Sequence, residues 1–588
     1  MTSVLPFSVC IMPEAPANSP RSISYPGYVH EILRHAGLAY STVAAEELTA
    51  ALPDLRLLLT VGEASLPTDT LGQLRAWVQA GGAWLSIAGT CGAPELFGVK
   101  IEPPAYSGWG ATQGTLGEGY LFAHSGGHAA LSHVRVPLHH FNGLPVRSVD
   151  GDCLAGVLDA HWRSTSRAAV TEMPVGRGRC LLIAPDLTGA VVRIQQGIAI
   201  TRDGVPAPDG TAPTADAVLK SDDGAVLDWI FDRQSAPGIP GLAAFLQPVA
   251  DHWRELLLRA IFHLAVEQHV ALPAVWLYPR NLPALGHLSH DSDGNDSRKA
   301  ERLLELLTSA DVASTWCVLA PGYTHEVITK IRQAGHELAM HFDAMSPGSA
   351  WDEGEFDRQW SALVRLFGAR PVTNKNHYLR WEGDSEFFEW CVRRGLQVDE
   401  SKGASKTGAA GFNFGTCHPY FPTDPRGRTM DVLEIPTPTQ DLEVFAPTAL
   451  ADSLLAAARA SHGVSHFLFH PQHIETPGVA EALLYAVEKG RQQGLEWWTA
   501  SRINSWERAR RKVEWHDSTA TAERAAIRLR VTDSLPAATI LWLAPYGGRA
   551  AINGAAREAV PTERWGYRFH AVTVDLQANN EYILEAMP

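Results

Sequence analysis

Residues 285–296 read LGHLSHDSDGND, and this short stretch decides how the second half of the chain is interpreted. We expect Leu285 to His290 to form a short apolar strand that stops at two carboxylates, Asp291 and Asp293. Side chains two residues apart in an extended chain point the same way, so both carboxylates can face one site. Asp, Ser, Asn and Gly are also favoured in turns and helix caps, so the stretch alone fits either a site or a turn.

The segments that follow alternate between helix and strand patterns. We expect a helix over residues 297–310, a strand over 313–320, a second helix over 324–335 and a third strand over 336–341. This order is typical of the opening of a parallel barrel. Catalytic groups in such barrels gather where the strands end, which is where the two carboxylates stand.

A pair of like-charged carboxylates needs either a neutralising cation or a proton on one member. A metal ion bound by Asp293 resolves this conflict, with Asp291 beside it to take a proton from the water that the metal activates. His341 ends the third strand, and its neutral imidazole is a well-placed further ligand.

Three later stretches resemble the NodB-type polysaccharide deacetylases. Residues 335–341, GHELAMH, resemble the family's GHEIGNH pattern, which leads into its metal histidines, and residues 367–381 and 465–474 resemble two later motifs. The resemblance covers residues 282–506 and implies a distorted (β/α) barrel. It also implies that Asp291 is the general base, Asp293 and His341 bind the metal, and His470 is the general acid.

One position departs from the family pattern. The family carries a second histidine four residues after the first, and here that position is Met345, a poor ligand for a borderline cation. We favour His377, at the tip of the next strand, as the third ligand. His336 is the alternative, although it lies an odd number of residues from His341 and would face away in a strand. A site with two protein ligands or none, in which His377 binds substrate, also stays open.

The predicted function is a metal-dependent de-N-acetylase that cleaves an amide on a carbohydrate, not a peptide bond. Zinc fits an Asp/His ligand set best, and nickel, cobalt or manganese fit the same ligands. Arg380, Trp381 and Tyr378 are the candidate substrate-binding residues, with Trp316 as a further aromatic and Arg380 also expected to pair with Asp291. The alternative is a glycan-binding protein that kept the barrel and lost hydrolysis.

Residues 1–235 alternate strand and helix patterns, as an open, flavodoxin-like α/β sheet does. The passage into GTCGAPELFGV, residues 89–99, resembles the class I glutamine-amidotransferase-like fold and places Cys91 near the family's nucleophile. The His and Glu partners are expected after the strand CLLIAP, where the chain reads DLTGAVV. Without a base a thiol is a poor nucleophile, so we expect a non-catalytic domain.

The remaining segments complete an α/β multidomain protein. Residues 236–280 are expected to be a linker and a bridging helix split at Pro248, and residues 281–510 the deacetylase barrel. Residues 511–588 show period-two runs between Gly, Asn and Pro, which indicate a small β-sandwich.

Charge and composition exclude some partners. The net charge of −15, with one short basic run at residues 508–512, argues against nucleic acid. The chain has no window of about eighteen apolar residues and no signal-peptide pattern, so we expect a cytoplasmic protein without a membrane span. The seven scattered cysteines are expected to be reduced thiols. The oligomeric state is not readable from the sequence.

Overall fold

The computed structural model describes residues 5–12, 25–103, 116–124, 127–212, 217–520 and 524–587. The chain forms two compact units, each assembled from separated segments. The first unit contains Met1–Val191, His252–Asn281 and Glu507–Pro588, and the second contains Val192–Asp251 and Leu282–Trp506. In the described residues, no helix has the length and apolar character needed to cross a membrane.

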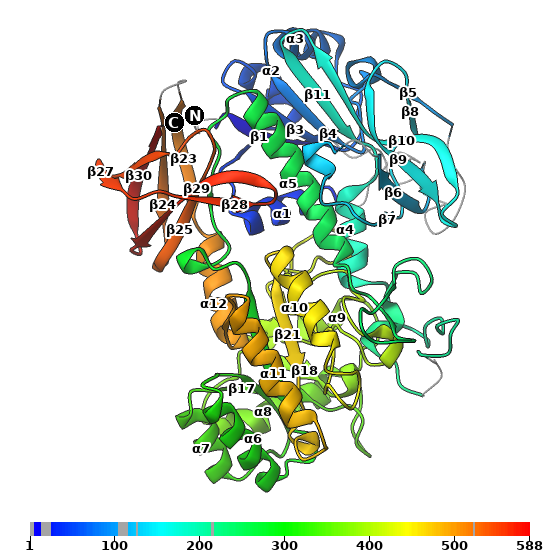
Figure 1. Cartoon of the computed structure of the whole chain (residues 1–588), viewed down its shortest axis with the longest axis vertical. Coiled ribbons are helices and arrows are strands. Elements are labelled where there is room, and N and C mark those ends of the chain that lie inside the picture. Colours follow the sequence, from blue (N-terminus) through cyan, green and yellow to red (C-terminus); the bar gives the residue numbers. More distant parts are fainter. Residues whose placement is uncertain are drawn as a thin grey trace. The chain divides into compact units, whose positions relative to one another are not determined.

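The second unit is built around one curled parallel sheet, a half-barrel (Figure 1). Its strand order is β20-β19-β18-β17-β16-β15-β21, with β22 also beside β15. The strands are β15 Leu285–Asp291, β16 Thr315–Leu319, β17 Glu337–Phe342, β18 Thr373–Asn376, β19 Val398–Asp399, β20 Leu433–Glu434, β21 Val464–Leu468 and β22 Glu496–Trp497. The helices are α6 Ser297–Ser309, α7 His325–Gln333, α8 Glu353–Phe367, α9 Glu386–Arg394, α10 Leu450–Ala460 and α11 Val479–Gln492. The expected alternation over residues 285–341 is therefore confirmed.

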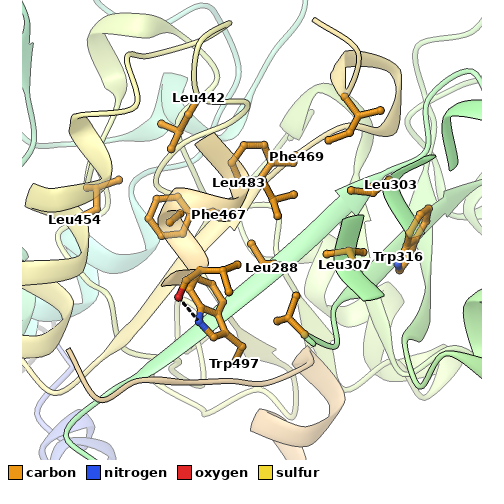
Figure 2. Packing of buried hydrophobic residues seen from close by; sticks show 14 of the residues in the cluster. Leu288, Leu303, Leu307, Trp316, Leu442, Leu454, Phe467, Phe469, Leu483 and Trp497 are labelled. Carbon is orange, nitrogen blue, oxygen red and sulfur yellow. Dashed lines mark hydrogen bonds between the residues drawn. The ribbon is translucent and has the colours of Figure 1, made fainter. Parts of the chain in front are cut away.

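Apolar side chains on one face of the sheet pack against these helices. In α6 the buried residues recur at helical spacing, Ala300, Leu303, Leu304 and Leu307, which turns one stripe of the helix toward the sheet. Figure 2 shows members of this core cluster around Leu288 of β15. Asp296 caps α6 by accepting hydrogen bonds from the backbone N–H groups of residues 298 and 299.

The opposite face of the sheet is polar. Leu288 pairs in register with Phe467, and both belong to the core cluster. Their neighbours along the strands, His287 and His466, are paired with each other and point to the inside of the curl. Polar side chains are therefore collected on the inner face of the curled sheet. This face extends to the edge of the sheet that is formed by the carboxyl ends of its strands.

The segment Val192–Asp251 belongs to the second unit. The domain boundaries expected from the sequence do not group this segment with the parallel sheet. Isolated bridges join it to the loops that follow the sheet strands: Ile200 to Gly383, Lys220 to Arg380 and Phe245 to Gly411. The helix expected to be split at Pro248 instead begins after it, since α5 is Val249–Glu267 and residues 243–244 form the short strand β13.

The first unit contains a nine-stranded mixed sheet of order β2-β1-β3-β4-β11-β10-β9-β6-β7. It is parallel through β11 and antiparallel beyond it. Its strands are β1 Phe7–Ile11, β2 Ser41–Thr42, β3 Leu57–Val61, β4 Ala83–Ile87, β6 Gly119–Ala123, β7 Leu138–His140, β9 Asp152–Asp159, β10 Ser164–Val175 and β11 Gly178–Ile183. Its helices include α1 Tyr28–Ala36 and α3 Thr68–Gln79.

Two antiparallel sheets also belong to the first unit. One has the order β14-β25-β29-β28 and the other β23-β24-β30-β26-β27. Their strands are β14 Pro273–Val275, β23 Glu514–Ala520, β24 Ala525–Val531, β25 Leu535–Leu543, β26 Arg549–Ile552, β27 Ala555–Arg557, β28 Val560–Arg564, β29 Tyr567–Leu576 and β30 Asn580–Met587. The period-two runs after residue 511 are thus strands, and β14 joins them from a distant part of the sequence.

Candidate metal centre and active site

Five of the residues singled out in the sequence stand at one edge of the parallel sheet. Asp291 is the last residue of β15, Asp293 follows it, and His341 is near the end of β17. His377 comes directly after β18, and His470 follows β21. Because these strands are parallel neighbours, their carboxyl ends bring all five side chains to one place.

Asp293, His341 and His377 form a compact group of possible metal ligands. The Nε2 atom of His341 is 3.4 Å from Oδ1 of Asp293, and the Nε2 atom of His377 is 3.6 Å from the same oxygen. His341 Nε2 is also 3.8 Å from Oδ2 of Asp291. The ligand atoms of the group lie within 4.8 Å of one another, so a single cation can reach all three.

The chemistry of this group fits a divalent metal. Oδ1 of Asp293 and Nε2 of His341 are buried without a hydrogen-bond partner in the protein. Buried polar atoms are rarely left unsatisfied, and a cation would satisfy these. One carboxylate and two imidazoles would hold a zinc ion through three protein ligands, the number that catalytic zinc sites usually have.

The outer nitrogen of each histidine is held by an acceptor. His341 Nδ1 donates to the backbone carbonyl of Lys375 at 2.9 Å, and His377 Nδ1 donates to Oδ1 of Asp343 at 3.0 Å. These bonds fix the tautomer in which Nε2 carries the lone pair, the form a metal ligand needs. Burial opposes ionisation of Asp343, but the bond from His377 and those from Ser346 and Met345 bring its pKa below the usual range.

Met345 and His336 lie outside this group. The backbone N–H of Met345 donates to Asp343, and its sulfur is 3.9 Å from Nη1 of Arg380. His336 precedes β17, at the other end of that strand from His341, and its Nδ1 accepts from the backbone N–H of Ser314 at 3.0 Å.

His470 approaches the carboxylates from β21. Its Nε2 is 3.8 Å from Oδ2 of Asp293 and 4.0 Å from Oδ2 of Asp291, while Nδ1 donates to Asp441. Burial alone would lower the pKa of His470, but Asp441, followed by Asp293 and Asp291, raises it to about 9. Asp441 also accepts from Nδ1 of His473 at 2.9 Å. No local sequence pattern points to Asp441, because its histidine partners lie 29 and 32 residues away along the chain.

Lys375 is the cation beside Asp291. Its Nζ is 3.5 Å from Oδ1 of Asp291 and 3.1 Å from Oε2 of Glu400, and it also contacts the hydroxyl of Ser289. Lys375 is fully buried; burial lowers its pKa, but Asp291 and Glu400 together raise it. The expected pairing of Arg380 with Asp291 is wrong, because Arg380 pairs with Glu382, with Nε 3.0 Å from Oε1.

A buried network supports Lys375 from the interior of the curl. Glu400 Oε1 accepts from Nε2 of His287 at 2.9 Å, and Nε2 of His466 is 2.8 Å from the hydroxyl of Ser289. Burial raises the pKa of Glu400, but Lys375 and His287 reverse this effect and bring it below the usual range. Alternation along β18 places Lys375 and His377 on the same side, which is a signal that the sequence did contain.

The aromatic candidates differ in exposure. Tyr378 is 56% exposed, has a positive φ of 60°, and its ring centroid is 4.7 Å from that of His377. Trp381 and Trp316 are fully buried in the core cluster, where their rings are not open to a sugar. Trp381 instead stacks under the ammonium group of Lys402, at 3.7 Å from the ring centroid.

Cys91 lies in the first unit, in the loop that follows β4, with a positive φ of 52°. The carboxylate of Glu63 accepts hydrogen bonds from the backbone N–H groups of Thr90 and Cys91. The side chain of Cys91 is fully buried. Burial is the main cause that raises the pKa of its thiol well above the ordinary value, and the charge of Glu63 adds to this effect.

No family model matches the sequence, and no curated protein matches it. Among solved structures, a Mycobacterium smegmatis protein assigned as a polysaccharide deacetylase is 20% identical over 40% of this chain and 94% of its own, with a TM-score of 0.32. Puue allantoinase is 15% identical over 39% and 91%, with a TM-score of 0.31. The Bc1960 peptidoglycan N-acetylglucosamine deacetylase is 16% identical over 38% and 89%, with a TM-score of 0.27.

Proposed function

We propose that the second unit is a metal-dependent hydrolase that removes an N-acetyl or similar acyl group from a carbohydrate. The observation that carries this proposal is the compact group of Asp293, His341 and His377, whose inward-facing atoms include two that are buried with no hydrogen-bond partner in the protein. A carboxylate, Asp291, and a proton-bearing imidazole, His470, flank the group, so a base and an acid lie within reach of one reacting amide.

A divalent ion held by Asp293, His341 and His377, most readily zinc, would supply the Lewis acidity that activates a water and polarises an acyl carbonyl. The protein's own contribution begins with Asp291. Its carboxylate takes the proton of the attacking water, and its Oδ1 atom lies 3.5 Å from the ammonium nitrogen of Lys375.

His470 completes the reaction by giving a proton to the departing amine. Asp441 holds Nδ1 and leaves Nε2 directed at the two carboxylates of the site. In the metal-free protein the charge of Asp441 outweighs the effect of burial and raises the pKa of His470, which favours the protonated form that a general acid needs. Asp441 therefore orients the acid and stabilises its charged form, as a buried carboxylate behind a histidine does elsewhere.

The substrate is proposed to meet the protein at Tyr378 and Arg380. The exposed ring of Tyr378 offers a surface for a sugar next to His377, and a backbone held at positive φ is commonly found at functional sites. Arg380 lies beyond it and is partly exposed, with Glu382 as its partner.

The test combines metal content with a matched variant. Purified protein is reconstituted with zinc, and acetate release from N-acetylated oligosaccharides is measured for the natural protein and for Asp291→Asn. We expect about one equivalent of metal in both, and a loss of about 10²- to 10⁴-fold in the variant, because the amide cannot accept the water's proton. Protein that binds no metal after reconstitution, yet binds oligosaccharide, would be a glycan-binding protein instead.

A further inference from the structure

The two oxygens of Asp293 have different surroundings. Oδ1 is buried, lacks a hydrogen-bond partner and faces the two imidazoles of the metal group. Oδ2 accepts a hydrogen bond of 3.2 Å from the side-chain amide of Gln472. Asp293 also has a positive φ of 34°, a backbone conformation that has to be held by its surroundings.

Gln472 is held in place by its own contacts. It lies in the short 3₁₀ turn Pro471–His473, directly after His470, and its backbone carbonyl accepts a hydrogen bond of 2.8 Å from Nζ of Lys299. Lys299 is in the first turn of α6, the helix capped by Asp296. The loop after β21 is therefore fixed against the loop after β15, which carries Asp293.

From these contacts we infer that Gln472 is a positioning residue for the metal centre: its amide selects the rotamer of Asp293 that turns Oδ1 toward the metal. This inference rests on the proposed function, because it assumes that Asp293 is a ligand. The competing partner of Asp293 is His470, whose Nε2 is 3.8 Å from the same Oδ2. By occupying Oδ2, Gln472 keeps the ligand carboxylate and the proton-donating imidazole in separate roles.

An exposed ion pair provides a matched control. Arg298 and Glu475 join the same two loops, with Nη2 2.8 Å from Oε2, but neither contacts Asp293. Their side chains are 68% and 41% exposed, so the pair is expected to contribute little. Comparing the two connections separates an effect on the ligand from a general effect of loosening the loops.

The experiment measures zinc affinity of the full-length protein by competition with a chromophoric chelator, and the visible spectrum of the cobalt-loaded form. Gln472→Met keeps the side-chain length and removes the donor. We expect it to weaken zinc binding by about tenfold or more, the range found when an outer-sphere partner of a ligand is lost, and to change the cobalt spectrum. Lys299→Met should weaken binding less, and Arg298→Ala should leave it within about twofold.

The outcomes are distinguishable. Zinc affinity within about twofold of the natural protein in Gln472→Met would overturn the inference while leaving the proposed function intact. Equal losses in Gln472→Met and Arg298→Ala would also overturn it, because the effect would then belong to the loops. If the natural protein binds no metal, the proposed function and this inference both fail. All of these outcomes are measured as metal affinity or as a cobalt spectrum, so none of them depends on enzymatic activity.

Discussion

At the scale of single residues, we propose that His377 is the third metal ligand, in place of the second histidine of the family pattern. We expect His377→Ala to lower metal affinity by roughly tenfold or more, since only Asp293 and His341 remain. Met345→Ala should leave affinity unchanged, and Met345→His should partly restore it in the His377→Ala background. Chelator competition measures all three variants. Unchanged affinity without His377, together with weaker substrate binding, would assign this residue to the substrate instead.

His470 gives the metal-free protein a pH-dependent stability. Its pKa is about 9 in the folded protein, against about 6.5 in an unfolded chain. The folded state binds this proton more tightly, so the stabilisation is complete below about pH 6.5 and is lost as the pH rises through about 9. We expect the difference in Tm between the natural protein and His470→Gln, both metal-free, to shrink over that interval. A constant difference would contradict the assignment.

The candidate site residues and the residues that support them differ in how far the sequence reveals them. Asp291, Asp293 and His341 stand where visible strand patterns end, so their meeting could be anticipated from parallel strand geometry. Asp441 and Gln472 have no such local pattern. Their roles depend on β21 lying beside β15, and that pairing joins segments far apart in the sequence.

At the scale of elements, the sequence predicts which face of a helix is buried, but it does not predict how deeply an aromatic side chain is buried. The stripe on α6 predicts which face of that helix is buried, and the structure agrees. For Trp381 and Trp316, residue type alone did not separate a sugar platform from a core side chain. Aromatics do both, and only the neighbouring helices and loops decide between the two.

The buried stripe of α6 leads to a stability prediction. Leu303 is fully buried in the core cluster, so Leu303→Ala leaves a cavity and should lower the free energy of unfolding by about 2–5 kcal/mol. Leu306, on the same helix, is only partly buried, and Leu306→Ala should cost clearly less. Urea denaturation measures both. Equal effects would mean that the helix does not use the expected face.

At the scale of the whole molecule, the two units are expected to be chemically independent. Cys91 is buried in the first unit with a raised thiol pKa, so Cys91→Ser should leave acetate release and zinc content within about twofold of the natural protein. Stoichiometric labelling of Cys91 by a glutamine-analogue electrophile would contradict this prediction and identify a second active site.

Segment boundaries were harder to anticipate than elements. The Pro/Gly-rich residues near 236–241 look like a linker, but Val192–Asp251 belongs with the parallel sheet through its bridges to the loops after β18 and β19. Local composition indicates where the chain forms turns. It does not indicate which distant segment a stretch of chain packs against.

The strand β14 pairs with β25, placing Ala274 opposite Leu541. Residues 282–506 of the second unit are translated between these two partners. During synthesis the edge of β14 that pairs with β25 therefore stays unpaired until residues 282–506 have been made. The parallel sheet of the second unit can thus fold on the ribosome before β25 is made, and refolding the finished chain from denaturant removes this order of events.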